Sequence, residues 1–274
     1  MSIQEVRRVS SRRSKAKVTT EVDKLEYYYE SHPTKEDLMG ESAVHINLTR
    51  YIRDVLECSF QQEDWIINLN MEIYQTSEHK EYPLAPDVSV FKGVALSESA
   101  RLSIRSWRML LPDRPGPSVV FEISSKETWR SDLEQDKKPT KYKRLGVKEY
   151  FAYDPNDPPV WSQEDYRGKR LLGWSYINGQ PTKLEPDELG RLWSNELESW
   201  LVPDKYYLRL YDRQNQLRLT RAEAECRAKE AERAAKEAER AAKEAAEQRE
   251  ATERAAKEVA WAKLRELGID PETL

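Results

Sequence analysis

The 274-residue chain is rich in charge, with 34% of its residues Asp, Glu, Lys or Arg and 38% hydrophobic, a balance that excludes one compact domain and predicts a globular core with a solvated helix or tail. We find no apolar run long enough to span a membrane and no apolar signal core at the N-terminus, and therefore expect a cytoplasmic protein without a membrane partner. Two cysteines and three histidines exclude a disulfide framework and a Cys/His metal cage.

Charge is unevenly distributed along the chain. Residues 1–20 hold six basic side chains against Glu5 alone, and we expect this segment to be a disordered tail that either contacts DNA or only improves solubility. Residues 21–217 hold 26 basic and 34 acidic side chains. An acidic folded region excludes non-specific coating of DNA, so any contact with nucleic acid must come from a local basic patch.

The first elements expected after residue 20 are a helix and two strands. Thr34 followed by Asp37 resembles a capping box, and apolar residues at helical spacing predict a helix over residues 36–57. Alternating apolar residues predict a strand over residues 65–73, and Pro86-Asp87 opens a second, short strand that ends at Phe91.

A strand–helix–strand unit follows. The apolar run 119–123 is typical of a central strand buried on both faces, a helix is expected to end at Leu145-Gly146, and residues 149–153 form another strand. This order requires a parallel pair of strands. Short strands over 160–212 would extend or cover the sheet. Residues 21–216 are therefore expected to form an α/β domain, a mixed sheet flanked by helices.

Residues 217–274 have a different composition. The heptad Ala-Glu-Arg-Ala-Ala-Lys-Glu occurs at 231–237 and again at 238–244. Strong helix formers with alanine at heptad spacing predict a continuous helical tail that forms a coiled coil. The alternative is a lone solvated helix stabilised by ion pairs between residues four apart. We expect the tail to project from the core, to aid a homodimer, and to play no part in chemistry.

Three acidic residues stand at positions suited to chemistry. Glu122 lies inside the apolar strand Val-Val-Phe-Glu-Ile, where an unpaired carboxylate is costly and needs a cation or hydrogen-bond donors. It is therefore either a functional carboxylate or half of a structural salt bridge. Asp87 and Glu41 are weak candidates taken alone, because an Asp after Pro is often part of a turn and glutamates are common on the polar face of a helix.

Four segments in order, MGESAVH, APDVSVF, PSVVFEISSKETW and YKRLGVKEYFAYDP, resemble the Uma-two family of restriction-type endonucleases, which is common in cyanobacteria and belongs to the PD-(D/E)XK superfamily. The resemblance covers roughly residues 25–212 and is most specific at LGVKEYFAYDP. The charged tail ending LRELGIDPETL is also similar to the tails of family members. The resemblance implies a restriction-endonuclease-like core.

The same resemblance implies a divalent-metal site. Glu41 matches the acid of the family's first helix, Asp87 the Asp of its Pro-Asp motif and Glu122 the acid of its central strand. In the superfamily such carboxylates hold Mg²⁺, for which Mn²⁺ would substitute; here the ligands would be Asp87, Glu122 and the backbone carbonyl of Ile123, with Glu41 as an optional addition. His45 matches the family's Glu-x-x-x-His and would steer Glu41, touch phosphate, or be structural.

The lysine departs from the superfamily pattern. The superfamily places it two residues after the strand acid, where this chain has Ser124. The family pattern Lys-Pro-x-x-Tyr is matched by Lys138 and Tyr142, which implies that Lys138 orients the attacking water. Lys126 is the rival, and neighbouring Lys137 leaves the choice open. Tyr142 would pack in the core or bond to the site.

Eight basic residues against four acidic ones lie between Lys126 and Lys148. They would form a positive rim for a phosphodiester, although an ordinary solvated helix face also explains them. Together with the resemblance, these features predict a Mg²⁺-dependent endonuclease that hydrolyses DNA. The alternative is a catalytically weak nuclease fold that binds nucleic acid or acts as a scaffold through its coiled-coil tail.

Overall fold

The computed structural model describes residues 42–61, 64–75, 83–111, 113–161, 163–177, 179–266 and 268. The chain divides into two compact units, one that ends at Thr220 and one that begins at Arg221. The predicted capping box and Glu41 lie outside the described residues.

A six-stranded mixed sheet is the centre of the first unit, with the strand order β1-β3-β5-β6-β7-β8. Strands β5 and β6 pair in parallel, and the other neighbouring pairs are antiparallel. The α/β fold with a mixed sheet is therefore confirmed. The strands are β1 (Trp65–Leu69), β3 (Val88–Lys92), β5 (Val119–Ile123), β6 (Glu149–Tyr153), β7 (Leu171–Ser175) and β8 (Thr182–Lys183).

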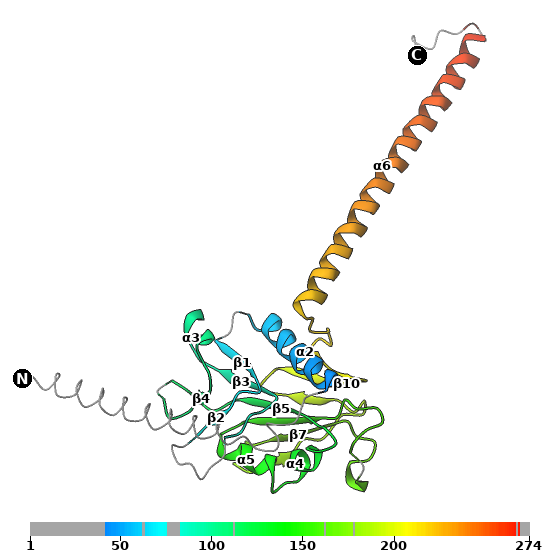
Figure 1. Cartoon of the computed structure of the whole chain (residues 1–274). Coiled ribbons are helices and arrows are strands. Elements are labelled where there is room, and N and C mark those ends of the chain that lie inside the picture. The colour runs from blue at the N-terminus through cyan, green and yellow to red at the C-terminus, as the bar shows by residue number, and fades with distance from the viewer. Residues whose placement is uncertain are drawn as a thin grey trace, which may run out of the picture. The chain divides into compact units, whose positions relative to one another are not determined.

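Helices cover both faces of this sheet (Figure 1). Helix α2 (Ala43–Ser59) packs on one face, where its Ile52 and Val55 join Phe121 of β5 in one hydrophobic cluster. The short helices α4 (Trp129–Leu133) and α5 (Lys138–Arg144) lie on the other face, where Trp129 and Tyr142 join Val120 in a second cluster. All five residues of β5 are buried, as a strand covered on both faces requires.

A second, three-stranded antiparallel sheet covers part of the α2 face. Its strands are β9 (Leu192–Ser194), β10 (Ser199–Asp204) and β11 (Tyr207–Tyr211). Leu201, Leu208 and Leu210 are fully buried in the same cluster as Phe121, so this sheet contributes to the core. The region predicted over 160–212 thus both extends the main sheet, through β7 and β8, and covers it.

Shorter elements complete the first unit. Strands β2 (Ile73–Tyr74) and β4 (Trp107–Arg108) form a parallel pair. Helix α3 (Glu98–Leu102) precedes β4, and a 3₁₀ turn spans Glu164–Tyr166. Within the part of the chain that the structure describes, no helix is both long and apolar enough to cross a membrane.

Two predicted boundaries are wrong. Helix α2 begins at Ala43 rather than near residue 36, because Ser42 is extended and its hydroxyl caps the backbone amide of His45. The strand expected over 65–73 ends at Leu69, because Asn70 takes a left-handed conformation with φ 46° and turns the chain before β2. Asn adopts that conformation more readily than most residues.

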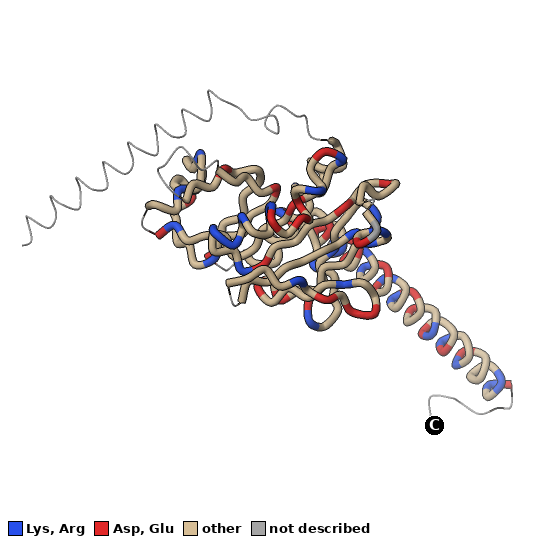
Figure 2. The backbone as a smooth tube through the Cα atoms, turned by 90° about the horizontal axis from the view of Figure 1, so that it is seen from below, with Lys and Arg blue, Asp and Glu red and all other residues tan. Residues whose placement is uncertain are grey.

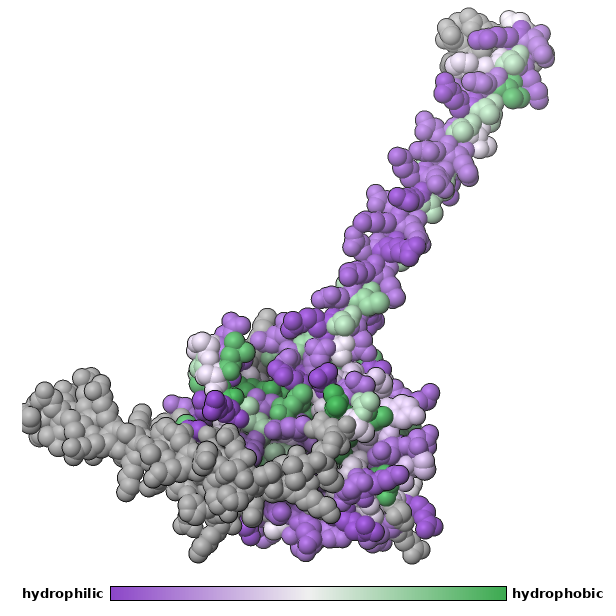
Figure 3. All heavy atoms as spheres, in the orientation of Figure 1, coloured by the Kyte–Doolittle hydropathy of each residue, from purple (hydrophilic) through white to green (hydrophobic). Residues whose placement is uncertain are grey.

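The second unit is the helix α6 (Arg221–Glu266), which confirms the expected long C-terminal helix. None of its residues is buried. Lys and Arg alternate with Glu along it (Figure 2), and its surface is hydrophilic over most of its length (Figure 3). Charges four residues apart pair within the helix, as in Glu232 with Lys236 at 2.6 Å and Arg233 with Glu237 at 3.3 Å.

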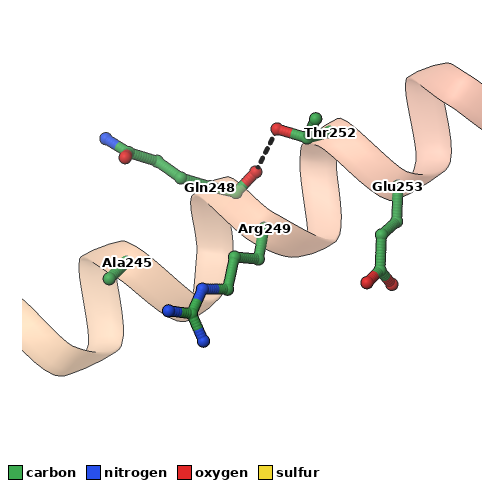
Figure 4. A pocket seen from close by; sticks show the side chains of 5 residues that line it. All are labelled: Ala245, Gln248, Arg249, Thr252 and Glu253. Atoms are coloured by element: carbon green, nitrogen blue, oxygen red, sulfur yellow. Dashed lines mark hydrogen bonds between the residues drawn. The ribbon is translucent and has the colours of Figure 1, made fainter.

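The alanine repeat of α6 is interrupted after Ala245, where Arg249 and Thr252 follow along the helix (Figure 4). Spacings of four and three residues connect Ala238, Ala242 and Ala245, and the same spacings then reach Arg249 and Thr252. The Thr252 hydroxyl donates to the carbonyl of Gln248 at 2.7 Å, within the helix itself. The alanine stripe is therefore not continuous along α6, although alanine returns at Ala256.

Candidate active site

The site is built where β3 begins and β5 ends. The two strands are antiparallel neighbours in which Val88 lies opposite Phe121. This register places Asp87 next to the end of β5, where its Oδ2 accepts a hydrogen bond from the backbone amide of Ile123 at 2.6 Å. Asp87 is thus fixed beside Glu122, one residue earlier on β5.

His45 approaches Asp87 from the α2 face of the sheet. Its Nε2 lies 3.0 Å from Asp87 Oδ1. The Ser42 cap holds the backbone of His45 in the first turn of α2, with the amide 3.2 Å from the Ser42 hydroxyl. His45 therefore contacts Asp87; Glu41, its other predicted partner, lies outside the described residues.

Helix α5 approaches Glu122 from the opposite face. Lys138 Nζ lies 3.0 Å from Glu122 Oε2, and the Tyr142 hydroxyl donates to Glu122 Oε1. Residues four apart share one side of a helix, so the Lys-Pro-x-x-Tyr pattern aims both side chains at the same carboxylate. Pro139 in the first turn is compatible with a helix that begins at Lys138.

Asp132, on α4, is a member of the cluster that sequence reasoning missed. Its Oδ1 lies 2.9 Å from Lys138 Nζ, and its Oδ2 accepts from the Ser124 hydroxyl at 2.9 Å. Its position in the sequence was informative, because Trp129 and Leu133 are apolar residues three places before and one place after it. Three-residue spacing from Trp129 predicts that Asp132 faces inward, and it is 1% exposed.

The three carboxylates differ in their electrostatic surroundings. Burial raises the pKa of Glu122 well above its usual range, with Asp87 and Asp132 adding to the rise and Lys138 opposing it. Burial likewise raises the pKa of Asp132, against the opposing charge of Lys138. Burial alone would also raise the pKa of Asp87, but the hydrogen bond and charge of His45, together with Lys138, outweigh it and lower that pKa.

Lys138 remains a cation in these surroundings. Burial works to lower the pKa of Lys138, but Glu122, Asp132 and Asp87 outweigh burial and raise it. Among the described residues, the ammonium of Lys138 thus faces three carboxylates, and the ring of His45 adds positive charge beside Asp87. The cluster holds more negative than positive charge when its carboxylates are ionised, and either a proton on Glu122 or an added cation restores the balance.

The donor set suits a hard divalent cation in part. Asp87 and Glu122 offer carboxylate oxygens from adjacent strands, and the carbonyl of Ile123 follows on β5, which is the oxygen chemistry that Mg²⁺ prefers. Across the described ranges, no group of three or more His, Cys, Asp and Glu side chains is arranged to hold a metal ion. The described residues can therefore supply two side-chain ligands and one backbone carbonyl, and water would complete the coordination.

The competing lysines occupy different surroundings. Lys126 is exposed in the loop after β5, and the Lys137 side chain is 49% exposed, whereas that of Lys138 is 16% exposed. Of the eight basic residues between Lys126 and Lys148, Lys138 is the one placed against the carboxylates. Six of the others are exposed: Lys126, Arg130, Lys137, Lys141, Arg144 and Lys148.

Comparison with known proteins agrees with the resemblance seen in the sequence. A solved structure from Anabaena variabilis ATCC 29413, described as "a putative nuclease belonging to DUF820", shares 18% identity and a TM-score of 0.34, over 55% of this chain and 73% of that one. No curated protein matches the chain. The profile of the Uma-two family, described as "Putative restriction endonuclease", matches residues 36–194. Because this match spans more than half of the sequence, the chain belongs to the Uma-two family of nuclease type.

Proposed function

We propose that the protein is a metal-dependent endonuclease that hydrolyses phosphodiester bonds in DNA. The observation that carries the proposal is the position of Lys138, whose ammonium lies 3.0 Å from Glu122 at the strand end that also holds Asp87. A cation beside paired carboxylates is the arrangement needed to bind a phosphate and to stabilise charge that develops on it. Family membership supports the same class of reaction.

Asp87 and Glu122 would hold Mg²⁺ or Mn²⁺, with the carbonyl of Ile123 completing the protein's share of the ligands. When bound, such an ion would activate water for attack and offset negative charge at the reacting phosphate. His45 keeps Asp87 oriented and ionised through its 3.0 Å contact. Tyr142 donates to one oxygen of Glu122, and the other oxygen contacts Lys138. Lys138 would orient the attacking water and stabilise the charged phosphoryl oxygens.

Exposed basic residues around α4 and α5 would contact the DNA backbone. Lys126, Arg130, Lys137 and Lys141 are all exposed and lie close in sequence to Asp132 or Lys138. Phosphate contacts of this kind position a duplex without reading its sequence. Because the folded region as a whole is acidic, binding would depend on this local patch and weaken as salt rises.

The test is cleavage of supercoiled and linear DNA by the purified full-length chain with Mg²⁺, with Mn²⁺ and with EDTA. We expect cleavage only with a divalent ion, and none from Asp87→Ala or Glu122→Ala although both variants keep the wild-type circular dichroism spectrum. Lys236→Ala, an exposed change on α6, is the control and should still cleave. Cleavage that survives loss of Asp87 or Glu122 would disprove the metal site. DNA binding without cleavage by the wild type would favour the scaffold function instead.

A further inference from the structure

The Asp132 carboxylate is held from several sides, although it belongs to a helix of only five residues. Its Oδ2 accepts from the hydroxyls of Ser124, at 2.9 Å, and Thr128, at 3.3 Å. Its backbone carbonyl accepts from the Tyr150 hydroxyl at 2.8 Å. These contacts anchor Asp132 to β5 and β6, the two parallel strands at the centre of the sheet. The carboxylate therefore has a fixed position relative to Glu122.

Ser124 connects this anchor to the site. Side chains two residues apart on a strand share one face of the sheet, so Ser124 and Glu122 stand on the same side of β5 at its end. Asp132 bonds to Ser124, Lys138 contacts Asp132 at 2.9 Å, and Lys138 contacts Glu122 at 3.0 Å. Ser124, Asp132, Lys138 and Glu122 thus form a continuous series of polar contacts, which starts at the end of β5 and returns to that strand.

Lys138 needs such a partner because its own tether is flexible. A lysine carries its charge on a four-carbon stem and loses considerable rotamer freedom when one position is imposed. Glu122 alone is a poor anchor, since its other oxygen is occupied by Tyr142 and its charge would be shared with a bound metal ion. Asp132 provides the second carboxylate contact of the ammonium, at 2.9 Å, and is not one of the proposed metal ligands.

We infer that Asp132 is a positioning residue, which fixes the ammonium of Lys138 beside Glu122 so that it is correctly placed when substrate arrives. The inference rests on the proposed function of Lys138. Asp132 itself would touch neither the metal nor the phosphate. The inference predicts that loss of the Asp132 carboxylate reduces the rate of the chemical step while leaving DNA binding nearly unchanged.

A purely structural ion pair is the competing explanation, and a buried carboxylate elsewhere in the same sheet provides the matched control. Glu149 is 3% exposed and accepts hydrogen bonds from Ser194 and from the backbone amides of Asn195 and Glu196. It lies at the start of β6, opposite Val119, whereas Glu122 is three residues further along β5, about 10 Å away at strand spacing. Glu149→Gln thus removes a buried charge outside the site.

The first experiment measures single-turnover cleavage with excess enzyme, the dissociation constant for DNA, and thermal unfolding, all on the full chain. Asp132→Asn is expected to lower the single-turnover rate by about tenfold to a hundredfold with DNA affinity within about twofold of wild type. Asp132→Glu should recover part of the rate, because it restores a carboxylate on a longer stem. Glu149→Gln should lower the unfolding temperature but not the rate.

The second experiment does not depend on cleavage. Acylation of Lys138 by a small amine-reactive ester is followed by peptide mass spectrometry, with exposed Lys141 in the same molecules as the internal reference. Loss of the Asp132 charge favours the unprotonated, reactive amine, so Asp132→Asn should raise acylation of Lys138 relative to Lys141 by several-fold, and Glu149→Gln should not. A wild type that cleaves no DNA would refute the proposed nuclease function, while this acylation ratio would still test the positioning role.

Two results would overturn the inference. One is an Asp132→Asn protein that cleaves at the wild-type rate. The other is a reduced rate accompanied by a lower unfolding temperature and an unchanged acylation ratio at Lys138, because that combination means that Asp132 only stabilises the fold. Partial recovery by Asp132→Glu together with a raised acylation ratio in Asp132→Asn supports it.

Discussion

Lys138→Ala is expected to destabilise the metal-free protein in a strongly pH-dependent way. The side chain is the ammonium between Glu122 and Asp132, which are 3% and 1% exposed. Removing one partner of a buried ion pair leaves the other charge uncompensated and costs about 3–5 kcal/mol. The variant can escape part of this cost by protonating a carboxyl group, so the loss depends on pH.

The sign follows from the direction of the pKa shifts. Folding raises the pKa of both Glu122 and Asp132, so the folded state binds protons more tightly than the unfolded state. Stability from these groups is fully present below their unfolded pKa values and is lost as pH rises through the folded values. Without Lys138 the folded values rise further, and each unit of additional shift corresponds to about 1.4 kcal/mol.

The assay is urea-induced unfolding of wild type and Lys138→Ala in EDTA, at about pH 5 and about pH 7.5. We expect the full loss of about 3–5 kcal/mol near pH 7.5 and a clearly smaller loss near pH 5, where protonating a carboxyl group costs only about 1 kcal/mol. Lys141→Ala should change the unfolding free energy by less than about 0.5 kcal/mol at either pH. A loss for Lys138→Ala that is equal at both pH values would refute the reasoning, because it would mean that Glu122 and Asp132 do not titrate with the lysine.

Three further predictions concern activity. Lys138→Ala should lower the cleavage rate by about 10²–10³-fold, whereas Lys126→Ala should mainly weaken DNA binding. Kinetics at saturating DNA separate the two effects, and the reverse pattern would make Lys126 the catalytic lysine. Tyr142→Phe should lower the cleavage rate by about tenfold with little loss of fold, measured under single turnover, and an unchanged rate would show that Tyr142 only packs. A chain that ends at Thr220 should stay folded and cleave DNA, as judged by circular dichroism and nuclease assay, with sedimentation reporting whether α6 mediates self-association; a folded but inactive truncation would make α6 part of the enzyme.

The choice of Thr220 for that truncation depends on the structure, because the sequence could not specify where the first unit ends. Composition predicts a tail from residue 217, but Arg218 still belongs to the first unit. Its guanidinium stacks over the Phe60 ring at 4.7 Å, and its Nε donates to the Ser199 hydroxyl at 2.8 Å. Contacts with residues so distant in sequence leave no local pattern. A cut at residue 216 would remove them, and a cut after Thr220 does not.

The central part of the fold could be predicted because its local and long-range requirements agree. The apolar run of β5, the left-handed Gly146 with φ 70° after α5, and β6 each match the structure. The break at Asn70 could not be predicted, because the apolar alternation continues past it to Ile73 and no glycine or proline marks the turn. The alternation continues although its residues pack in different places: Ile67, with Trp65 and Leu69, belongs to the first hydrophobic cluster, whereas Ile73, with Met71, belongs to the second.

At the site, the sequence identifies residues whose surroundings are determined by their own helix or strand. It does not identify Asp132, whose surroundings depend on another helix. Glu122 is conspicuous because it interrupts a buried strand, whereas Asp132 lies in a five-residue helix whose importance arises from contact between α4 and α5. The choice among lysines is intermediate. Once Pro139 places the start of α5, spacing decides the matter, because Lys138 is four residues before Tyr142 and shares its side of the helix. Lys137 is the residue that precedes the helix, so it does not share that side. A lysine on a helix can therefore be assigned from its spacing to a buried neighbour on the same helix. Its contact with a carboxylate on another helix, here Asp132, is found only in the folded structure.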